Sequence, residues 1–221
     1  MPEFATTEVP WLTDPILPDP PAGAVPVLHD REYRVQSFLL ENGNLLIQGA
    51  VRDQKPPGLY VPGDPDPLVM HHMQVELEVA LPDRVIVAVQ TDLVSYPHST
   101  CPSIENHYDK LIGLSIARGF THKIRELFGG PRGCSHTTAL LQAMAPIAMQ
   151  SGKSIECVEA ERRGEPNPII VRPPSESWKY LTNTCHVWAE DGPRRGEVER
   201  GGVQTIPVDV RLRALGRAPR R

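Results

Sequence analysis

Strict alternation of apolar and polar side chains over residues 74–81 constrains the fold of this chain more than any other feature. Valine or leucine stands at every second position, and polar or small residues stand between them. This is the period of a β-strand with one buried and one solvated face. After a Pro82-Asp83 turn, the alternation continues through Val85, Val87 and Val89. The pattern predicts an antiparallel hairpin with one wet face.

A second hairpin is predicted upstream, where β-prone runs over residues 33–40 and 45–51 flank Glu41-Asn42-Gly43-Asn44. Asn-Gly is a strong hairpin signal because both residues tolerate positive φ. Residues 56–69, which are rich in proline, are expected to form a surface loop between the two hairpins.

Helical patterns follow the hairpins. They cover residues 102–114, with Ser103 as the expected cap, then 120–128, 134–150 and 155–163, and Pro146 is expected to bend the third helix. Ile169-Ile170-Val171 predicts a short strand. The expected fold is α+β: a four-stranded antiparallel meander of two hairpins, packed by three or more helices.

We expect three regions: a proline-rich arm over residues 1–27, a single α+β domain over 28–190, and a basic tail over 191–221. The tail holds eight arginines, yet the whole chain has a net charge of -4, so the remainder is acidic. An acidic body argues against a nucleic-acid partner. No apolar run approaches 20 residues and no secretory signal stands at the start, which predicts a cytoplasmic protein without a membrane partner.

Four cysteines in a cytoplasmic chain are expected to be reduced thiols. Two of them stand where a loop becomes a helix, and backbone N–H groups at such positions favour the thiolate that binds zinc or iron. Cysteine and histidine also occur close together twice. We therefore predict zinc or iron as cofactor, held by Cys101, Cys134, His136, Cys185 and His186. The alternatives are a reactive thiol without metal, and cysteines that pack as small buried residues.

His71-His72 begins the second hairpin, and because strand neighbours point to opposite faces, at most one of them faces the interior. Asp92 lies at the end of this hairpin, and Asp53 lies at the end of the first. Carboxylates there commonly close turns, but strand ends are also where sites are built. We predict that Asp92, His71 and His136 move protons in catalysis.

An ordered series of motifs carries a family resemblance. The motifs are Leu28-His29-Asp30-Arg31, Val51-Arg52-Asp53-Gln54-Lys55-Pro56, His71-His72-Met73, Cys101-Pro102-Ser103-Ile104, the runs 111–120 and 127–136, and Asn183-Thr184-Cys185-His186. Over roughly residues 28–190 the chain resembles a bacterial family known as domain of unknown function 2889 (DUF2889). That family usually has Thr-His-Leu after its Gly-Cys pair, where this chain has Ser135-His136-Thr137. It also has an acidic residue a few positions later, where Leu140 and Leu141 stand here.

A second, fainter resemblance rests on the order of the elements: a hairpin, a Cys-led helix, and Gly-Cys before a long helix. Iron–sulfur scaffold proteins and the Cys-containing terminal domain of some ribonucleotide reductases are similar in this order. The resemblance implies a zinc ion or cluster on Cys101, Cys134 and Cys185, with His136 or His186 as the fourth ligand.

Together these features predict a cytoplasmic enzyme of small-molecule metabolism. It would use a Cys/His-bound metal or an activated thiolate in a hydrolase or lyase reaction. One alternative is a non-catalytic metal- or cluster-binding module, or a subunit of a larger complex. Another is a plain globular domain with an unrecognised binding cleft. The expected partners are a small-molecule substrate and either another protein or a second copy of the chain.

Overall fold

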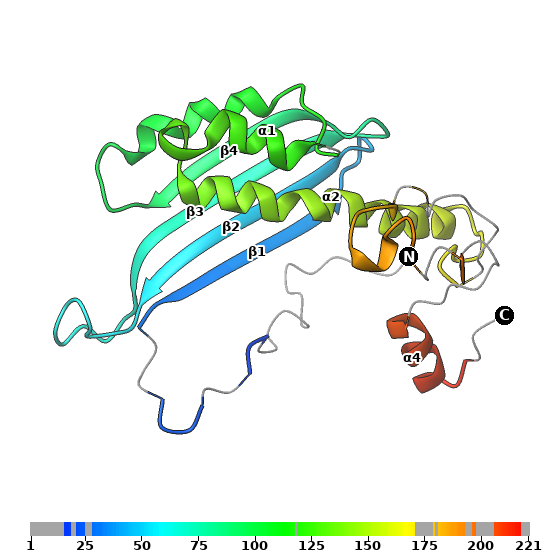
Figure 1. Ribbon diagram of the computed structural model, residues 1–221, viewed down its shortest axis with the longest axis horizontal. Coiled ribbons are helices and arrows are strands. Elements are labelled where there is room, and N and C mark those ends of the chain that lie inside the picture. Colours follow the sequence, from blue (N-terminus) through cyan, green and yellow to red (C-terminus); the bar gives the residue numbers. More distant parts are fainter. Residues whose placement is uncertain are drawn as a thin grey trace.

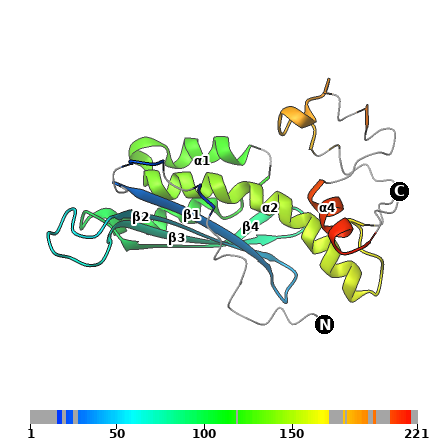
Figure 2. The ribbon, with the colours of Figure 1, turned by 90° about the horizontal axis from the view of Figure 1, so that it is seen from below.

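The computed structural model of this protein describes residues 16–18, 21–24, 28–117, 119–170, 179, 181–192, 196–197 and 206–217. Four strands form one antiparallel sheet in chain order: β1 (Asp30–Leu39), β2 (Leu45–Lys55), β3 (Leu68–Ala80) and β4 (Val85–Ser95). Helices α1 (Phe120–Phe128) and α2 (Ser135–Arg162) lie on the same side of this sheet, as Figure 1 and Figure 2 show. The predicted α+β fold, a four-stranded meander packed by helices, is confirmed.

Further elements with described bounds are the 3₁₀ helices η2 (Cys101–Leu111), η3 (Gly130–Arg132) and η5 (His186–Trp188) and the α-helix α4 (Ile206–Ala214). Within the described ranges, no helix combines the length and the apolar character needed to cross a bilayer. Much of the predicted arm over residues 1–27 and of the predicted tail over 191–221 lies outside the described residues.

The β1–β2 hairpin turns at the predicted residues. Gly43 has φ 84°, a left-handed conformation that glycine adopts without steric cost. Its N–H donates to the Leu40 carbonyl at 3.0 Å, and the Leu40 N–H donates to the Asn44 carbonyl at 2.9 Å. The Asn42 side chain accepts the Asn44 N–H at 3.0 Å. The turn chemistry therefore fixes the register of β1 against β2.

The β3–β4 hairpin differs from its prediction. Leu77 lies opposite Val89, but a β-bulge between Glu78 and Val79 places Val79 opposite Ile86. Ile86 is therefore fully buried, whereas Val87 is 43% exposed. The expectation that Val87 shares the buried face with Val89 is wrong, because a bulge inserts one residue and reverses the alternation beyond it.

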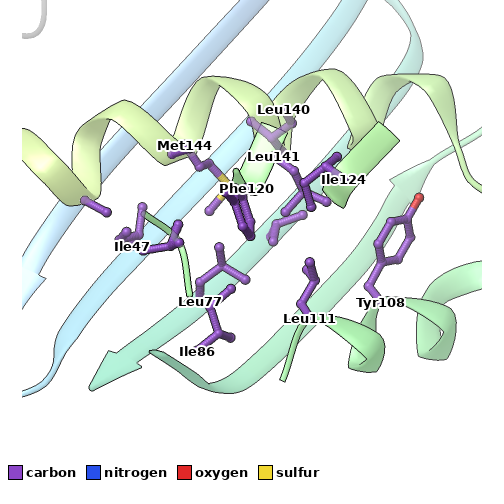
Figure 3. Close-up of a cluster of buried hydrophobic side chains, with 14 of the residues drawn as sticks. Ile47, Leu77, Ile86, Tyr108, Leu111, Phe120, Ile124, Leu140, Leu141 and Met144 are labelled. Atoms are coloured by element: carbon purple, nitrogen blue, oxygen red, sulfur yellow. The ribbon is translucent and has the colours of Figure 1, made fainter. Parts of the chain in front are cut away.

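The core lies between the sheet and its two covering helices. Leu140, Leu141 and Met144 of α2 lie over Ile47 and Leu77 of the sheet, as Figure 3 shows. Gly49 of β2 allows close approach of α2, since a Cβ at that position would lie 2.8 Å from the Met144 sulfur. The sheet face that carries the alternating apolar residues is thus the face that the helices cover.

Three predicted elements are corrected. The segment after Thr100 is the 3₁₀ helix η2, and the Ser103 hydroxyl donates to the Thr100 carbonyl at 2.8 Å instead of capping an α-helix. The two helices predicted over 134–150 and 155–163 form the single helix α2, with Pro146 inside it. The Ile170 N–H donates to the Asn167 carbonyl at 3.0 Å, so residues 169–170 form a turn where a strand was predicted.

Packing explains why α2 continues through Pro146. Proline removes one backbone N–H donor and crowds the preceding turn. Met144 and Ala145 before it, and Ala148 and Ser151 after it, are all buried. The Ser151 hydroxyl also lies 2.7 Å from the Ser37 hydroxyl of β1. Tertiary contacts on both sides of the proline therefore hold the helix together.

Candidate metal centre

A row of three residues crosses the sheet near the end of β2. Arg31 of β1 lies opposite Asp53 of β2, and Asp53 lies opposite His71 of β3. Residues directly opposite each other on antiparallel strands project from the same face. The Asp53 side chain is only 1% exposed, so this is the face that the helices cover. A β-bulge after Asp53 interrupts the regular pairing with β3.

His136 reaches this row from the first turn of α2. Its Nε2 lies 3.1 Å from Asp53 Oδ2, and His71 Nδ1 lies 3.2 Å from the same oxygen. The two imidazole rings stack, with centroids 4.0 Å apart and 26° between their planes. His29, which precedes β1, places Nε2 3.6 Å from Asp53 Oδ1. Asp53 is thus surrounded by three imidazoles and one guanidinium.

The charges around Asp53 set its protonation state. Arg31 donates from Nε and Nη2 to the two carboxylate oxygens at 2.5 and 2.6 Å. These hydrogen bonds outweigh the effect of burial and lower the pKa of Asp53 from 3.8 to about 2. The pKa of His136 is lowered by burial and by the nearby charge of His71, while Asp53 acts in the opposite direction. At neutral pH the carboxylate is therefore ionised and His136 is neutral, which is the state that metal ligands need.

The donor atoms fit a divalent metal ion. The ligand atoms of Asp53, His71 and His136 all lie within 4.8 Å of one another, and this is the one such group of three or more His, Cys, Asp or Glu side chains in the described part of the chain. Metal–ligand bonds of about 2.0–2.2 Å imply ligand–ligand distances of roughly 2.8 Å, for ligands at right angles, to roughly 3.6 Å, for ligands at the tetrahedral angle. The two measured N–O distances, 3.1 and 3.2 Å, fall in that interval.

His71 Nδ1 is a buried nitrogen of this group without a hydrogen-bond partner. His71 Nδ1 is shielded from solvent, and despite its 3.2 Å distance from the carboxylate it forms no hydrogen bond of acceptable geometry. A buried polar atom without a partner is costly. A cation shared with Asp53 and His136 would satisfy it.

Arg31 has two opposite effects on such a cation. It keeps Asp53 ionised, but its own positive charge repels a metal. The side chains of His29 and Arg31 are each 40% exposed, whereas those of His71 and His136 are mostly buried. The centre is therefore more exposed on the side of His29 and Arg31.

The structure separates the three predicted catalytic residues. His71 and His136 meet at Asp53, but Asp92 lies opposite the exposed Gln74, on the sheet face opposite α1 and α2. There its carboxylate accepts a hydrogen bond from Gln90 Nε2 at 2.9 Å. Asp92 is therefore not a neighbour of the two histidines.

Of the five predicted metal ligands, His136 alone belongs to the group of three. Cys134 lies beside the group, with Sγ 3.8 Å from His136 Nδ1. Cys101 packs at the edge of the core, the exposed Cys185 precedes η5, and the exposed His186 is the first residue of η5. In the described structure, the three cysteines therefore do not assemble into the expected Cys/His centre.

The sequence pattern marked Asp53 only as a carboxylate at a strand end, and it assigned no role to Arg31 or His29. The turn signal alone does not give the Arg31–Asp53 pair: a two-residue turn at Asn42-Gly43 would place Arg31 opposite Gln54. The observed loop instead pairs Leu39 with Leu45, and this register places Arg31 opposite Asp53. No local signal connects either residue to His71 or His136.

Tyr108 of η2 anchors the start of α2. It is fully buried, and its hydroxyl accepts the Cys134 N–H at 2.9 Å. Tyr108→Phe leaves this N–H without its acceptor, and we expect a loss of about 1–2 kcal/mol in the free energy of unfolding. Urea unfolding of the metal-free variant measures the loss. An unchanged midpoint would mean that water replaces the hydroxyl without cost.

Fold and site together define an α+β protein with a candidate centre of two histidines and one aspartate. Residues 29–150 match a protein family described as Protein of unknown function (DUF2889). The match covers more than half of the chain and includes His29, Arg31, Asp53, His71 and His136, and the chain belongs to this family. No curated protein and no solved structure matches the chain, so the resemblance to iron–sulfur scaffolds finds no support there.

Proposed function

We propose that this protein is a cytoplasmic metalloenzyme of small-molecule metabolism. Asp53, His71 and His136 bind one zinc or iron ion, and the reaction is a hydrolysis or an elimination. The observation that carries the proposal is the convergence of one buried carboxylate oxygen and two imidazole nitrogens at ligand–ligand distances. Three protein ligands leave coordination positions open, as in catalytic rather than structural sites. Both zinc and non-haem iron enzymes use two histidines with one carboxylate.

The chemistry follows from the arrangement. A divalent ion bound here supplies Lewis acidity, which polarises a carbonyl or makes bound water acidic near neutral pH. Asp53 contributes negative charge and is held in place by Arg31. His29 offers an imidazole on the open side that can accept or release a proton close to the substrate. The partner that fits this role is a small molecule, and we propose no nucleic-acid or membrane partner.

The adjacent residues His71 and His72 provide a test of the proposed metal site. His71 points into the centre, whereas His72 lies on the opposite face, where it contacts Gln74 at 3.4 Å. We expect about one zinc ion per wild-type chain after chelator treatment and zinc titration. Loss of one ligand of three is expected to weaken binding in His71→Gln by roughly 100-fold or more. His72→Gln changes the same residue type in the same strand and should bind as the wild type does.

Isothermal titration calorimetry and elemental analysis measure these affinities, with iron(II) tested under anaerobic conditions. Equal affinity in His71→Gln, His72→Gln and the wild type would show that the metal, if bound, is held elsewhere. A wild type that takes up neither zinc nor iron would contradict the proposed function itself.

A further inference from the structure

The thiol of Cys134 faces the ring nitrogen of His136 that does not face Asp53. Cys134 Sγ lies 3.8 Å from Nδ1, and Asp53 Oδ2 lies 3.1 Å from Nε2. A neutral imidazole carries one proton, so one of its nitrogens donates and the other accepts. The partners on the two sides of the ring therefore decide where that proton sits.

Without a metal, the proton belongs on Nε2. An ionised carboxylate only accepts hydrogen bonds, and Asp53 is held in that form by Arg31. The contact between Nε2 and Oδ2 therefore requires Nε2–H. Nδ1 is then an acceptor, and the Cys134 S–H is the donor that the geometry provides.

Metal binding requires the other tautomer. The lone pair of Nε2 must then point at the ion, so the proton moves to Nδ1 and needs an acceptor there. A cysteine sulfur is both a weak donor and a weak acceptor. The same thiol can therefore bond to either tautomer without moving.

We propose that Cys134 is a positioning residue for the metal centre: its sulfur, held against His136 Nδ1, accepts a hydrogen bond from Nδ1–H and so keeps the Nε2 lone pair free for the ion. This inference rests on the proposed function and adds to it the residue that makes His136 a ligand. Partners behind a ligating histidine commonly fix its tautomer and ring orientation in this way.

The backbone of Cys134 is fixed from three sides. Its N–H donates to Tyr108 Oη at 2.9 Å, and its carbonyl accepts the Thr138 N–H at 2.9 Å in the first turn of α2. Gly133 before it lies against Phe128, where a Cβ would meet the Phe128 carbonyl oxygen at 2.6 Å. The sulfur and the imidazole, two residues apart, are thus held in one rigid unit.

The test compares zinc binding in Cys134→Ala, Cys134→Ser and Cys157→Ala. Cys157 lies near the other end of α2, where its thiol faces Asn167, so it controls for loss of a cysteine from the same helix. We expect alanine at position 134 to weaken zinc binding by about 10- to 100-fold. Serine, which also donates and accepts, should restore affinity to within a few-fold, and Cys157→Ala should match the wild type.

A second measurement reads the tautomer directly. Long-range ¹H–¹⁵N spectra of the histidine rings, assigned for His136 with a His136→Gln variant, should show Nε2–H in the metal-free wild type and Nδ1–H after zinc is added. Serine at position 134 can also cap α2 and raise the melting temperature. That effect is seen without zinc and does not move the ring proton, so the two roles are distinguishable.

The outcomes separate the two proposals. Wild-type affinity in Cys134→Ala, or an equal loss in the alanine and serine variants, overturns the positioning role and leaves the metal centre in place. A ring proton that stays on Nε2 in the zinc-loaded protein overturns it as well. Failure of the wild type to bind zinc or iron overturns the proposed function, and the positioning role with it.

Discussion

Asparagine in place of Asp53 is expected to abolish metal binding and to destabilise the metal-free protein. The substitution preserves the size of the side chain but removes the charge that Arg31, His71 and His136 surround. The centre then loses its anionic ligand, while Arg31 stays beside a neutral amide. We expect zinc affinity to fall below detection in a calorimetric titration that resolves the wild-type site.

The stability effect has a defined pH dependence. Lowering the pKa of Asp53 from 3.8 to about 2 corresponds to about 2 kcal/mol of folding free energy. Because the folded-state pKa is the lower one, this stabilisation is fully present above pH 3.8 and is lost as the pH falls toward 2. The difference between wild type and Asp53→Asn should therefore be constant from neutral pH down to about pH 5 and shrink below pH 4.

Asp92→Asn is the matched control. It makes the same change on the uncovered face of the sheet, where Gln90 is the hydrogen-bond partner, and it should leave zinc binding unchanged. Chemical unfolding of the metal-free proteins across this pH range provides the measurement. A difference between wild type and Asp53→Asn that does not vary with pH would show that the Arg31–Asp53 pair does not stabilise the fold through its charge.

Alanine in place of Gly133 is expected to cause the largest loss of stability among the single substitutions considered. The added Cβ would lie 2.6 Å from the carbonyl oxygen and 2.8 Å from the Cβ of Phe128. Phe128 is buried at the end of α1, so its backbone cannot move away without disturbing the core. We expect a loss of about 3 kcal/mol in the free energy of unfolding.

The same substitution should reach the metal centre, because Gly133 directly precedes Cys134 and the first turn of α2. Zinc affinity is expected to fall together with stability. Gly152→Ala is the matched control, since Gly152 lies inside α2 with open space at its Cβ position. Alanine there should stabilise the helix by about 0.5–1 kcal/mol. Urea unfolding of both variants measures the two opposite effects, and equal midpoints would contradict the steric argument at Gly133.

The residues between positions 33 and 92 show which features of the sheet local sequence patterns predict. Alternation and the Asn42-Gly43 turn predict two hairpins, because a turn type and a side-chain period depend on a few neighbouring residues. The register of β1 against β2 differs by one residue from that of a two-residue turn at Asn42-Gly43. The β-bulge at Glu78 and Val79 was not predictable from the same pattern. It depends on how β4 packs under the helices, and valines on either face of a strand have the same local preference.

In the helical region, too, local sequence patterns predict only part of the structure. Gly119 and Gly129 bound α1 as the sequence predicts, because glycine is a local signal. Pro146 predicts a bend, and α2 continues through it to Arg162, beyond the predicted end near residue 150. Burial of residues on both sides of the proline outweighs its local preference, and that burial exists only once the sheet is in place.

Local sequence patterns predicted the four strands, α1 and the α+β class, and they drew attention to His71 and His136. Only the tertiary structure shows that these two histidines meet at Asp53, that Asp92 lies on the other face, and that within the described residues no cysteine belongs to the group of three. The physical reason is the distance along the chain between the residues that interact. Strand and helix patterns arise from contacts between near neighbours, whereas the site joins β1, β2, β3 and α2 through sheet register, a β-bulge and helix packing, which no short segment encodes.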